Sequence, residues 1–475
     1  MIENLKPYPE IKDSGLSWLG EIPAHWDIKR NGSLFQQRNA VGEPDWPILE
    51  VSLRTGVRIR EFGSSKRKQA MSDKAKYKCA AKGDYVYNMM RMWQGAAGIA
   101  PVDGLVSPAY VVAKPLPHAN PAYFASLFRT DDYLAEIDAF SRGIVKDRNR
   151  LYWDQFKQIS TPCPPTEEQN AIARFLAWAT NRLDRAIGAK RRIIALLQEQ
   201  KQAIIHRAVT RGLDPSVPLK DSEIPWLGEI PEHWEVRRLR RVVKRIDQGV
   251  SPLATGFLAE GNSWGVLKSG CVNRGIFRET EHKQLSQSFK INSSIVVKPG
   301  DVLISRACGS PSLVGSVGRV GQLHYNLILS DKTFRPTFYE SVDIDFMVLA
   351  MNSSYYRRQV EQAISGAEGM ANNLPLSSLR DFSLAIPPLN EAKAIACSIE
   401  KSLAGTNAVI ARNEHEIILL REYRTRLIAD VVTGKLDVRQ VAARLPEEIE
   451  PQDASERGDG IEELGLDGDE ETELP

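Results

Sequence analysis

Lys12-Asp13-Ser14, continued by Trp18-Leu19-Gly20-Glu21-Ile22-Pro23 and His25-Trp26, returns 208 residues later as Lys220-Asp221-Ser222, Trp226-Leu227-Gly228-Glu229-Ile230-Pro231 and His233-Trp234. Self-similarity at a fixed offset indicates that a chain contains repeated structural units. In a chain of 475 residues, which is long enough for two to four domains, this repeat predicts a tandem of two related units.

A second repeat follows each start motif. Residues 164–214 align without a gap to residues 387–437, from Pro164-Pro165 with Pro387-Pro388 to Leu213-Asp214 with Leu436-Asp437. The offset is now 223, so the region between the two repeats is 15 residues longer in the second unit. Each unit therefore contains a start motif, a variable region and a second repeated segment.

The second repeated segment has the pattern of a long helix. Thr166 is placed as an N-cap with Glu167 and Glu168 in the first turn, where carboxylates favour the free amides. Apolar residues then recur every three or four positions, and a helix over 167–208 would be about 63 Å long. These positions predict a seam between the two helices: Ile172, Leu176, Leu183, Ile193, Leu197, Ile204, Ile395, Ile399, Ile410, Ile417, Leu420 and Leu427. Two matched copies favour an intramolecular coiled coil over the alternative, an intermolecular one.

The variable regions are rich in short apolar runs separated by Gly, Pro, Asn and Asp, as in Tyr85-Val86-Tyr87 and Val302-Leu303-Ile304. The predicted fold class is α+β, with two mixed α/β domains, two long antiparallel helices and pseudo-twofold symmetry. The expected divisions are a first start segment and domain (1–162), a central helical spacer (163–214), a second start segment and domain (215–385), a C-terminal helical spacer (386–445) and an acidic disordered tail (446–475).

Charge is unevenly distributed along the chain. Residues 446–475 carry thirteen acids and one base, a net charge of −12, so the rest carries +14 against a total of +2. A basic body attracts polyanions, and nucleic acid becomes a candidate partner. No apolar run is long enough to span a bilayer, the N-terminus lacks the apolar core of a signal peptide, and five scattered cysteines suggest free thiols. These features predict a cytoplasmic protein without a metal site.

The first half contains Gly83-Asp84-Tyr85-Val86-Tyr87-Asn88-Met89-Met90-Arg91 and then Ser141-Arg142-Gly143 ahead of Pro162-Cys163-Pro164-Pro165. The second half contains Gly300-Asp301-Val302-Leu303-Ile304-Ser305-Arg306 ahead of Pro387-Pro388, so a Gly-Asp strand precedes a Pro-Pro pair in both halves. The chain resembles the specificity subunits of type I restriction-modification systems over roughly residues 10–440. The resemblance implies two target recognition domains, each reading half of a split asymmetric DNA target, and helices that dock methyltransferase subunits. It departs from the family at Ala392, which replaces Gln169, and in the acidic tail.

Basic and amide residues in turns are the candidate DNA contacts, because they neutralise phosphates or pair with base edges. The first domain offers Arg54, Arg58, Arg60, Lys66, Arg67, Lys68, Arg91, Gln94, Lys146, Arg148 and Arg150, and the second offers Lys268, Asn273, Arg274, Arg306 and Arg319. Lys66-Arg67-Lys68 is interpreted as a phosphate clamp or a solvated surface run. Arg91 and Arg306 are interpreted as base readers, or as residues paired within the fold.

The sequence does not have the motifs of a DNA-modifying enzyme. It contains no Asn-Pro-Pro-Tyr or Asp-Pro-Pro-Tyr loop for a flipped base and no phosphate-binding GxxxxGK[ST] loop. The prediction is therefore a non-catalytic subunit that binds double-stranded DNA, two methyltransferase subunits and, where present, two restriction subunits, with no membrane partner. S-adenosylmethionine, ATP and magnesium are expected on the partners, with no cofactor on this chain. A coiled-coil scaffold and a stand-alone DNA-modifying enzyme are the alternatives.

Overall fold

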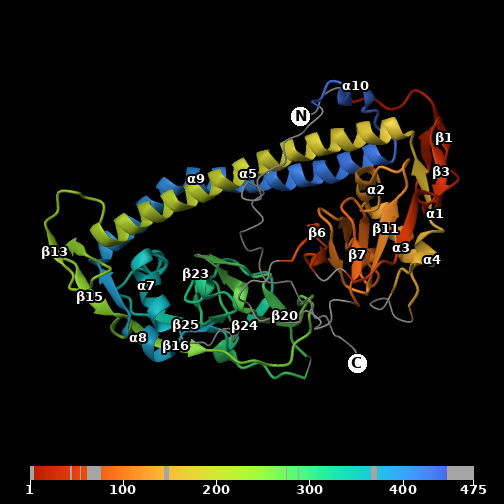
Figure 1. Cartoon of the computed structure of the whole chain (residues 1–475). Coiled ribbons are helices and arrows are strands. Elements are labelled where there is room, and N and C mark those ends of the chain that lie inside the picture. The colour runs from red at the N-terminus through yellow and green to blue at the C-terminus, as the bar shows by residue number, and fades with distance from the viewer. Residues whose placement is uncertain are drawn as a thin grey trace. The chain divides into compact units, whose positions relative to one another are not determined.

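The computed structural model describes residues 5–42, 45–53, 55–60, 76–143, 149–273, 275–286, 288–364 and 372–446. The described chain divides into two compact units, which are labelled by element in Figure 1. Residues up to Lys190 and from His415 onward form unit 1, and Arg191–Glu414 form unit 2. The boundary between the units cuts both long helices, so each unit contains part of each helix.

Unit 1 is built on an antiparallel sheet of order β4-β11-β8-β9, whose strands are β4 (Phe35–Arg38), β11 (Tyr110–Pro115), β8 (Tyr85–Asn88) and β9 (Ala97–Ile99). Phe35, Tyr85 and Phe128 lie in its buried aromatic core, with ring centroids 5.3 to 6.3 Å apart. The other paired strands are β1 (Ile11–Asp13) with β2 (Glu21–Pro23), β3 (Asp27–Arg30) with β12 (Ser160–Cys163), β5 (Leu49–Ser52) with β6 (Gly56–Ile59), and β7 (Lys78–Ala80) with β10 (Gly104–Val106). Short helices are α1 (Asn31–Leu34), η2 (Met92–Gln94), α2 (Pro121–Leu127), α3 (Asp131–Phe140), α4 (Trp153–Phe156) and α10 (Arg439–Ala442).

Unit 2 repeats this plan with a sheet of order β16-β25-β21-β23, formed by β16 (Val243–Gln248), β25 (Thr333–Phe338), β21 (Val302–Ser305) and β23 (Val317–Arg319). Start-motif strands recur as β13 (Leu219–Asp221) with β14 (Glu229–Pro231) and β15 (Glu235–Arg238) with β27 (Ser383–Ile386). Unit 2 also contains β20 (His282–Gln284), β17 (Trp264–Leu267) and β24 (Asn326–Ile328) in one sheet, β18 (Val272–Asn273) with β19 (Ile276–Phe277), and β22 (Ala307–Cys308) with β26 (Asn372–Asn373). Its short helices are η4 (Leu239–Arg241), η5 (Ser269–Cys271), η6 (Ser293–Ile295), η7 (Pro311–Leu313), α6 (Ile344–Ala350), α7 (Ser354–Ala363) and α8 (Leu376–Asp381).

Two long helices, α5 (Thr166–Arg211) and α9 (Leu389–Val432), pack against each other in both units. In unit 1 the Arg424 guanidinium donates to the Asp184 carboxylate at 2.7 Å, and Lys190 pairs with Glu416. In unit 2 the Lys201 ammonium donates to the Asn407 side-chain oxygen at 2.9 Å. The first part of α5 thus pairs with the last part of α9, and the helices run antiparallel. The predicted α+β class, with two β-rich domains and two packed helices, is confirmed.

The predicted helix seam needs one correction. Buried seam residues are Ile172, Leu176, Leu183, Ile395, Ile399, Ile417 and Leu427, and half-buried ones are Leu197, Ile204, Ile410 and Leu420. Ile193 is wrong as a seam position, because it is 44% exposed, whereas Ile187 is buried and Ile194 is half-buried. The three-and-four spacing continues through the polar Lys190 and Lys201, which make cross-helix contacts. Skipping these polar positions shifted the expected stripe by one residue.

One smaller difference concerns the start of α5. Thr166 is the first residue of α5, and its hydroxyl donates to the His118 carbonyl rather than serving as an N-cap. The predicted division between domains and spacers stays a prediction, and the acidic residues 447–475 lie outside the described residues. Among the residues that the structure describes, no helix combines the length and apolarity needed to cross a membrane.

Candidate nucleic-acid interface

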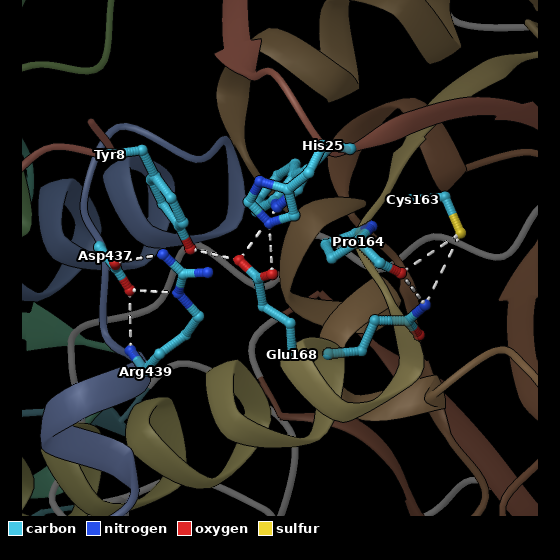
Figure 2. Close-up of polar contacts among 9 residues, drawn as sticks. Tyr8, His25, Cys163, Pro164, Glu168, Asp437 and Arg439 are labelled. Carbon is cyan, nitrogen blue, oxygen red and sulfur yellow. Dashed lines mark hydrogen bonds and ion pairs between the residues drawn. The ribbon is translucent and has the colours of Figure 1, made fainter. Parts of the chain in front are cut away.

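The frame of unit 1 is organised by the carboxylate of Glu168, in the first turn of α5 (Figure 2). It accepts hydrogen bonds from the Tyr8 hydroxyl at 2.6 Å and from the Trp26 indole nitrogen at 3.0 Å, and His25 Nε2 lies 2.7 Å from its other oxygen. Burial, followed by the hydrogen bond to Glu168, raises the pKa of Tyr8, so its hydroxyl remains a donor. The repeated His-Trp dipeptide therefore joins the start motif to the long helix.

A second set of contacts holds the N-terminal segment of unit 1. The Arg439 guanidinium pairs with the Asp437 carboxylate at 2.7 Å and lies 5.0 Å from the centre of the Tyr8 ring. The Asp437 amide also donates to the Lys6 carbonyl at 2.8 Å. The segment that follows α9 is thereby fixed against the start of the chain, as Figure 2 shows for Tyr8, Asp437 and Arg439.

Unit 2 repeats the carboxylate junction with Glu391. Its oxygens lie 2.7 Å from His233 Nε2 and 3.1 Å from the Trp234 indole nitrogen, which donates. The following residue differs between the junctions, as expected from the sequence. In unit 1 the Gln169 amide donates to the Pro164 carbonyl at 2.8 Å and its oxygen accepts from the Asn120 amide at 2.8 Å. Ala392 offers no polar group and instead packs in the apolar core with Trp234.

The repeated Gly-Asp turns are also structural. Gly83 and Gly300 have φ values of 91° and 88°, in the left-handed region that favours glycine. The Asp84 carboxylate accepts from the Ala81 amide at 2.9 Å and from Arg38 at 2.6 Å. Asp301 accepts from the Lys298 amide at 2.9 Å and from Arg335 at 3.1 Å. The motif shared by the two halves therefore fixes the entry into β8 and β21.

The structure describes five of the eleven candidate DNA contacts in the first domain. Arg58 is 60% exposed and pairs with Glu50 across the β5–β6 hairpin at 2.5 Å, and Arg150 is exposed at a backbone bridge to Arg142. Arg60 and Arg91 are half-buried, and Gln94 is exposed on η2. The remaining candidates lie outside the described residues: Arg54, Lys66, Arg67, Lys68, Lys146 and Arg148.

Four of the five candidates in the second domain are described, and Arg274 lies outside the described residues. Lys268 lies 3.9 Å from the Glu281 carboxylate, and Arg319 pairs with Asp345 at the surface. Asn273 is half-buried in the β18–β19 hairpin, and its side-chain oxygen has no hydrogen-bond partner among the described residues. These three side chains belong to different elements, and the measured contacts do not bring them together.

Arg306 occupies an internal position rather than an open one. Its guanidinium donates to the Asp331 carbonyl at 2.9 Å and lies 5.6 Å from the centre of the Phe334 ring. The alternative of pairing within the fold therefore has direct geometric support, with a carbonyl and a ring as the partners. Arg306 consequently is a weaker candidate for base reading than Gln94, whose side chain is exposed.

Sequence reasoning missed two exposed apolar side chains in unit 2. Leu253 is 87% exposed and Phe257 is 77% exposed, between β16 and β17. Their backbone is fixed, because the Phe257 carbonyl accepts from the Gln284 amide at 2.9 Å and the Ala259 amide donates to His282 Nε2 at 2.9 Å. A fixed segment that presents apolar side chains to solvent is typical of an interaction surface. In the sequence, Leu253 and Phe257 are apolar residues among turn-forming residues, a pattern that buried residues also show, so their exposure had no sequence signal.

Among the described residues, no group of three or more His, Cys, Asp or Glu side chains is arranged to hold a metal ion. The buried Cys271 is instead an inert thiol, since burial raises its pKa to about 12. The described candidate contacts are therefore separate surface side chains on a shared frame.

Comparisons with known proteins agree with this description. The chain is 28% identical over 291 residues to the type I restriction enzyme MjaVIII specificity subunit of Methanocaldococcus jannaschii, covering 60% of this chain and 64% of that relative. It is 24% identical over 444 residues to the putative MjaX specificity subunit of the same organism, covering 89% of this chain and 96% of that one. The chain belongs to the specificity (HsdS) subunits of type I restriction-modification systems. These are the non-catalytic subunits that select the DNA target.

The fold of this specificity subunit is also found in a solved structure from a type I restriction-modification system, which was determined to explain complex assembly and conformational transition. The TM-score is 0.55 at 16% identity, over 87% of this chain and 99% of that one. No protein-family model matches the specificity subunit.

Proposed function

We propose that this specificity subunit reads a bipartite, asymmetric DNA target, with one β-rich domain for each half-site. The observation that carries this proposal is the contrast between a shared frame and different exposed residues. Both units have the same strand order and the same His-Trp-Glu junction. A covalently linked pair of similar domains resembles a dimer but is free to diverge, so its target need not be a palindrome.

Exposed basic side chains are the proposed phosphate contacts, and exposed amide and apolar side chains are the proposed base contacts. Arg58, Arg150 and Arg319 are exposed and suit the first role, and the surface ion pairs of Arg58 and Arg319 are weak enough to exchange for phosphate. Gln94 suits hydrogen bonding to a base edge, and Leu253 and Phe257 suit apolar contact with thymine methyl groups. Two such readers on one side of a duplex imply half-sites about 34 Å apart.

The long helices are proposed to dock two methyltransferase subunits and, where the host has them, two restriction subunits. The described surfaces of α5 and α9 support this role, because apolar side chains such as Leu196, Ile418 and Leu419 remain 48 to 65% exposed on helices that are already paired. S-adenosylmethionine, ATP and magnesium then belong to those partners. The complex would act on DNA in the cytoplasm.

Exchange of one domain tests the proposal. In the assembled complex with methyltransferase subunits, residues 30–160 are replaced by those of a relative, and methylated adenines are mapped across the host genome by single-molecule sequencing. The expected result is a new sequence in one half of the target and an unchanged other half. A matched exchange of residues 238–382 should change only the opposite half. A change in both halves after either exchange contradicts the assignment of one domain to each half-site.

A further inference from the structure

Unit 2 has a strongly basic segment that contains none of the candidate DNA contacts. Six of the nine residues from 237 to 245 are basic: Arg237, Arg238, Arg240, Arg241, Lys244 and Arg245. They extend over β15, η4 and the beginning of β16, and all except the half-buried Arg237 are exposed. Together with the exposed Arg380 on α8, they form what we call the Arg237–Arg245 surface.

This surface contains a shallow binding pocket. A pocket of about 440 Å³ is lined by Arg240, Lys244, Arg245 and Arg380, together with the Ser377 hydroxyl and the Asp381 carboxylate. Guanidinium and ammonium groups around a hydroxyl provide the donors that a phosphate accepts from. The pocket has enough volume for a phosphate group, and its lining includes Arg240 of η4 and the beginning of β16.

Acidic neighbours only partly balance this charge. Asp381 pairs with Arg240 at 2.7 Å and lies 3.5 Å from Arg238. Asp247 lies 3.4 Å from Arg245, but its shorter contact is with the buried Arg335 at 2.9 Å. Exposed ion pairs of this kind contribute little free energy. They orient the arginines without preventing them from exchanging a carboxylate for a phosphate.

Glu235 and Glu340 are the other acids beside the surface. Glu235 pairs with Arg237 at 2.6 Å, and the almost fully exposed Glu340 lies 3.6 Å from Lys244. No ion pair is recorded for Arg241 or Arg380 with any residue that the structure describes. The surface therefore has seven basic side chains and four acidic neighbours, and it retains a positive charge.

The equivalent surface of unit 1 keeps only part of this charge, because Lys29 and Arg30 match Arg237 and Arg238 but four other basic positions are not basic there. The frames coincide, since Arg30 pairs with Ser160 between β3 and β12 just as Arg238 pairs with Ser383 between β15 and β27. At the offset of 208 residues, Arg240, Arg241, Lys244 and Arg245 correspond to Gly32, Ser33, Gln36 and Gln37. Unit 2 therefore carries four basic side chains at positions of the shared frame where unit 1 has uncharged residues.

We propose that the Arg237–Arg245 surface binds the DNA backbone beside the half-site read by unit 2. The proposal rests on the proposed function and deepens it. The surface belongs to the frame rather than to the region that differs between the units, so its contacts would be independent of base sequence. DNA is favoured over an acidic protein because it offers regularly spaced phosphates to a row of basic side chains. Six of these seven side chains are arginines, whose planar fork matches phosphate.

To test the proposal, four basic residues are replaced in one variant by their unit 1 counterparts: Arg240→Gly, Arg241→Ser, Lys244→Gln and Arg245→Gln. The complex with methyltransferase subunits is titrated with target DNA and with unrelated DNA over a range of salt concentrations. Each lost phosphate contact lowers the salt slope by about 0.9, so the slope should fall by up to about 3.6. Affinity at physiological salt should fall about tenfold or more. The ratio of affinities for target and unrelated DNA should not change.

A control variant removes the same charge elsewhere, through Lys6→Gln, Lys12→Gln, Lys220→Gln and Lys435→Gln, all at exposed positions outside the long helices. An equal fall in slope in this control overturns the proposal, because net charge then explains the effect. An unchanged salt slope in the variant with four basic residues replaced also overturns the proposal. Weakened binding of methyltransferase subunits together with normal DNA binding overturns it as well. If the wild-type complex shows no preference for its target, the proposed function fails instead.

A second measurement avoids any effect of the substitutions on folding. Arginines of the wild-type complex are modified with phenylglyoxal in the presence and absence of target DNA, and the modified positions are located by mass spectrometry. DNA should protect Arg240, Arg241 and Arg245, whereas the exposed Arg439, which contacts Tyr8 in unit 1, should be modified equally in both samples. Equal modification of all four arginines overturns the proposal.

Discussion

The Trp26 indole nitrogen lies 3.0 Å from the Glu168 carboxylate and donates to it, although 142 residues separate them in the sequence. This contact links the start of the chain to the first turn of α5. Trp26 is fully buried and the Glu168 side chain is only 6% exposed, so water cannot replace the carboxylate as an acceptor. Glu168 therefore helps to fix the first domain on the long helix, and mutation can test this role.

Substitution of Glu168 by alanine should destabilise unit 1. The change leaves the buried Trp26 indole and the Tyr8 hydroxyl without an acceptor, and each such loss costs about 1–3 kcal/mol. A decrease of about 2–5 kcal/mol in the free energy of unfolding is expected, measured by urea denaturation followed by tryptophan fluorescence. The neighbouring exposed Glu167→Ala is the control and should change this free energy by less than about 0.5 kcal/mol. Similar losses in both variants would contradict the role of Glu168.

Substitution of Arg335 by leucine should destabilise unit 2. The Arg335 side chain is 8% exposed and its guanidinium contacts Asp247 at 2.9 Å, Asp301 at 3.1 Å and the Val296 carbonyl at 2.8 Å. Removing one partner of a fully buried pair costs about 3–5 kcal/mol, and the cost here should be smaller, because the Asp247 and Asp301 side chains are 25% and 22% exposed. Hydrogen exchange should show the loss in β21 and β25. Arg319→Leu, which removes an exposed arginine paired with Asp345, should leave exchange of these strands unchanged.

The sequence was sufficient to predict the frame, because the frame depends on repeats and periodicity. The duplicated His-Trp motif and the three-and-four spacing of apolar residues led to the two units and the helices. Periodicity failed at Ile193, where the seam passes through Lys190 and Lys201, since a polar seam residue is indistinguishable from a solvent-facing one until its partner is known. Those partners, Glu416 and Asn407, lie more than 200 residues away.

The contact residues were harder to predict than the frame. Arg306 follows a Gly-Asp strand as Arg91 does, but its guanidinium bonds to the Asp331 carbonyl, a tertiary contact that no local pattern reports. Exposure of Leu253 and Phe257 could not be anticipated, because apolar residues near turns are usually buried. The four basic residues that the Arg237–Arg245 surface has beyond its unit 1 counterpart were visible in the sequence. They become informative only when the equivalent unit 1 positions are known to share the same frame.

The reactivity of two cysteine thiols, Cys397 and Cys271, should report on the folded state. Cys397 is exposed and should be alkylated by iodoacetamide at pH 8, whereas Cys271 is buried with a pKa raised to about 12 and should stay unmodified. Mass spectrometry of the labelled peptides checks this order. Above the unfolded pKa near 9.0, the unfolded chain loses the Cys271 proton before the folded chain does. The free energy of unfolding should therefore fall as pH rises above about 9, and Cys271→Ala should reduce that fall.

Replacement of Phe257 by serine should weaken DNA binding without destabilising unit 2. The side chain is 77% exposed, so its removal costs little packing, whereas the loss of a base contact costs about 1–3 kcal/mol, or roughly 5- to 150-fold in affinity. Fluorescence anisotropy of the assembled complex with target DNA measures the effect. Leu219→Ser, at a position 39% exposed on β13, is the control. Equal affinities for the wild type and Phe257→Ser would exclude this side chain from the DNA contact.

Lengthening both helices should lengthen the unread spacer of the target. Seven residues inserted after Lys190 in α5 and seven after Glu414 in α9 keep the three-and-four seam in register, since seven residues complete one heptad. The added helix measures about 10.5 Å, which is close to three base pairs at about 3.4 Å each. Mapping of methylated adenines should return both half-sites unchanged with a longer gap. Insertion into α5 alone should instead break the Lys190–Glu416 pairing register and lower the free energy of unfolding. A stable double insertion with an unchanged gap would show that the helices do not set the half-site separation.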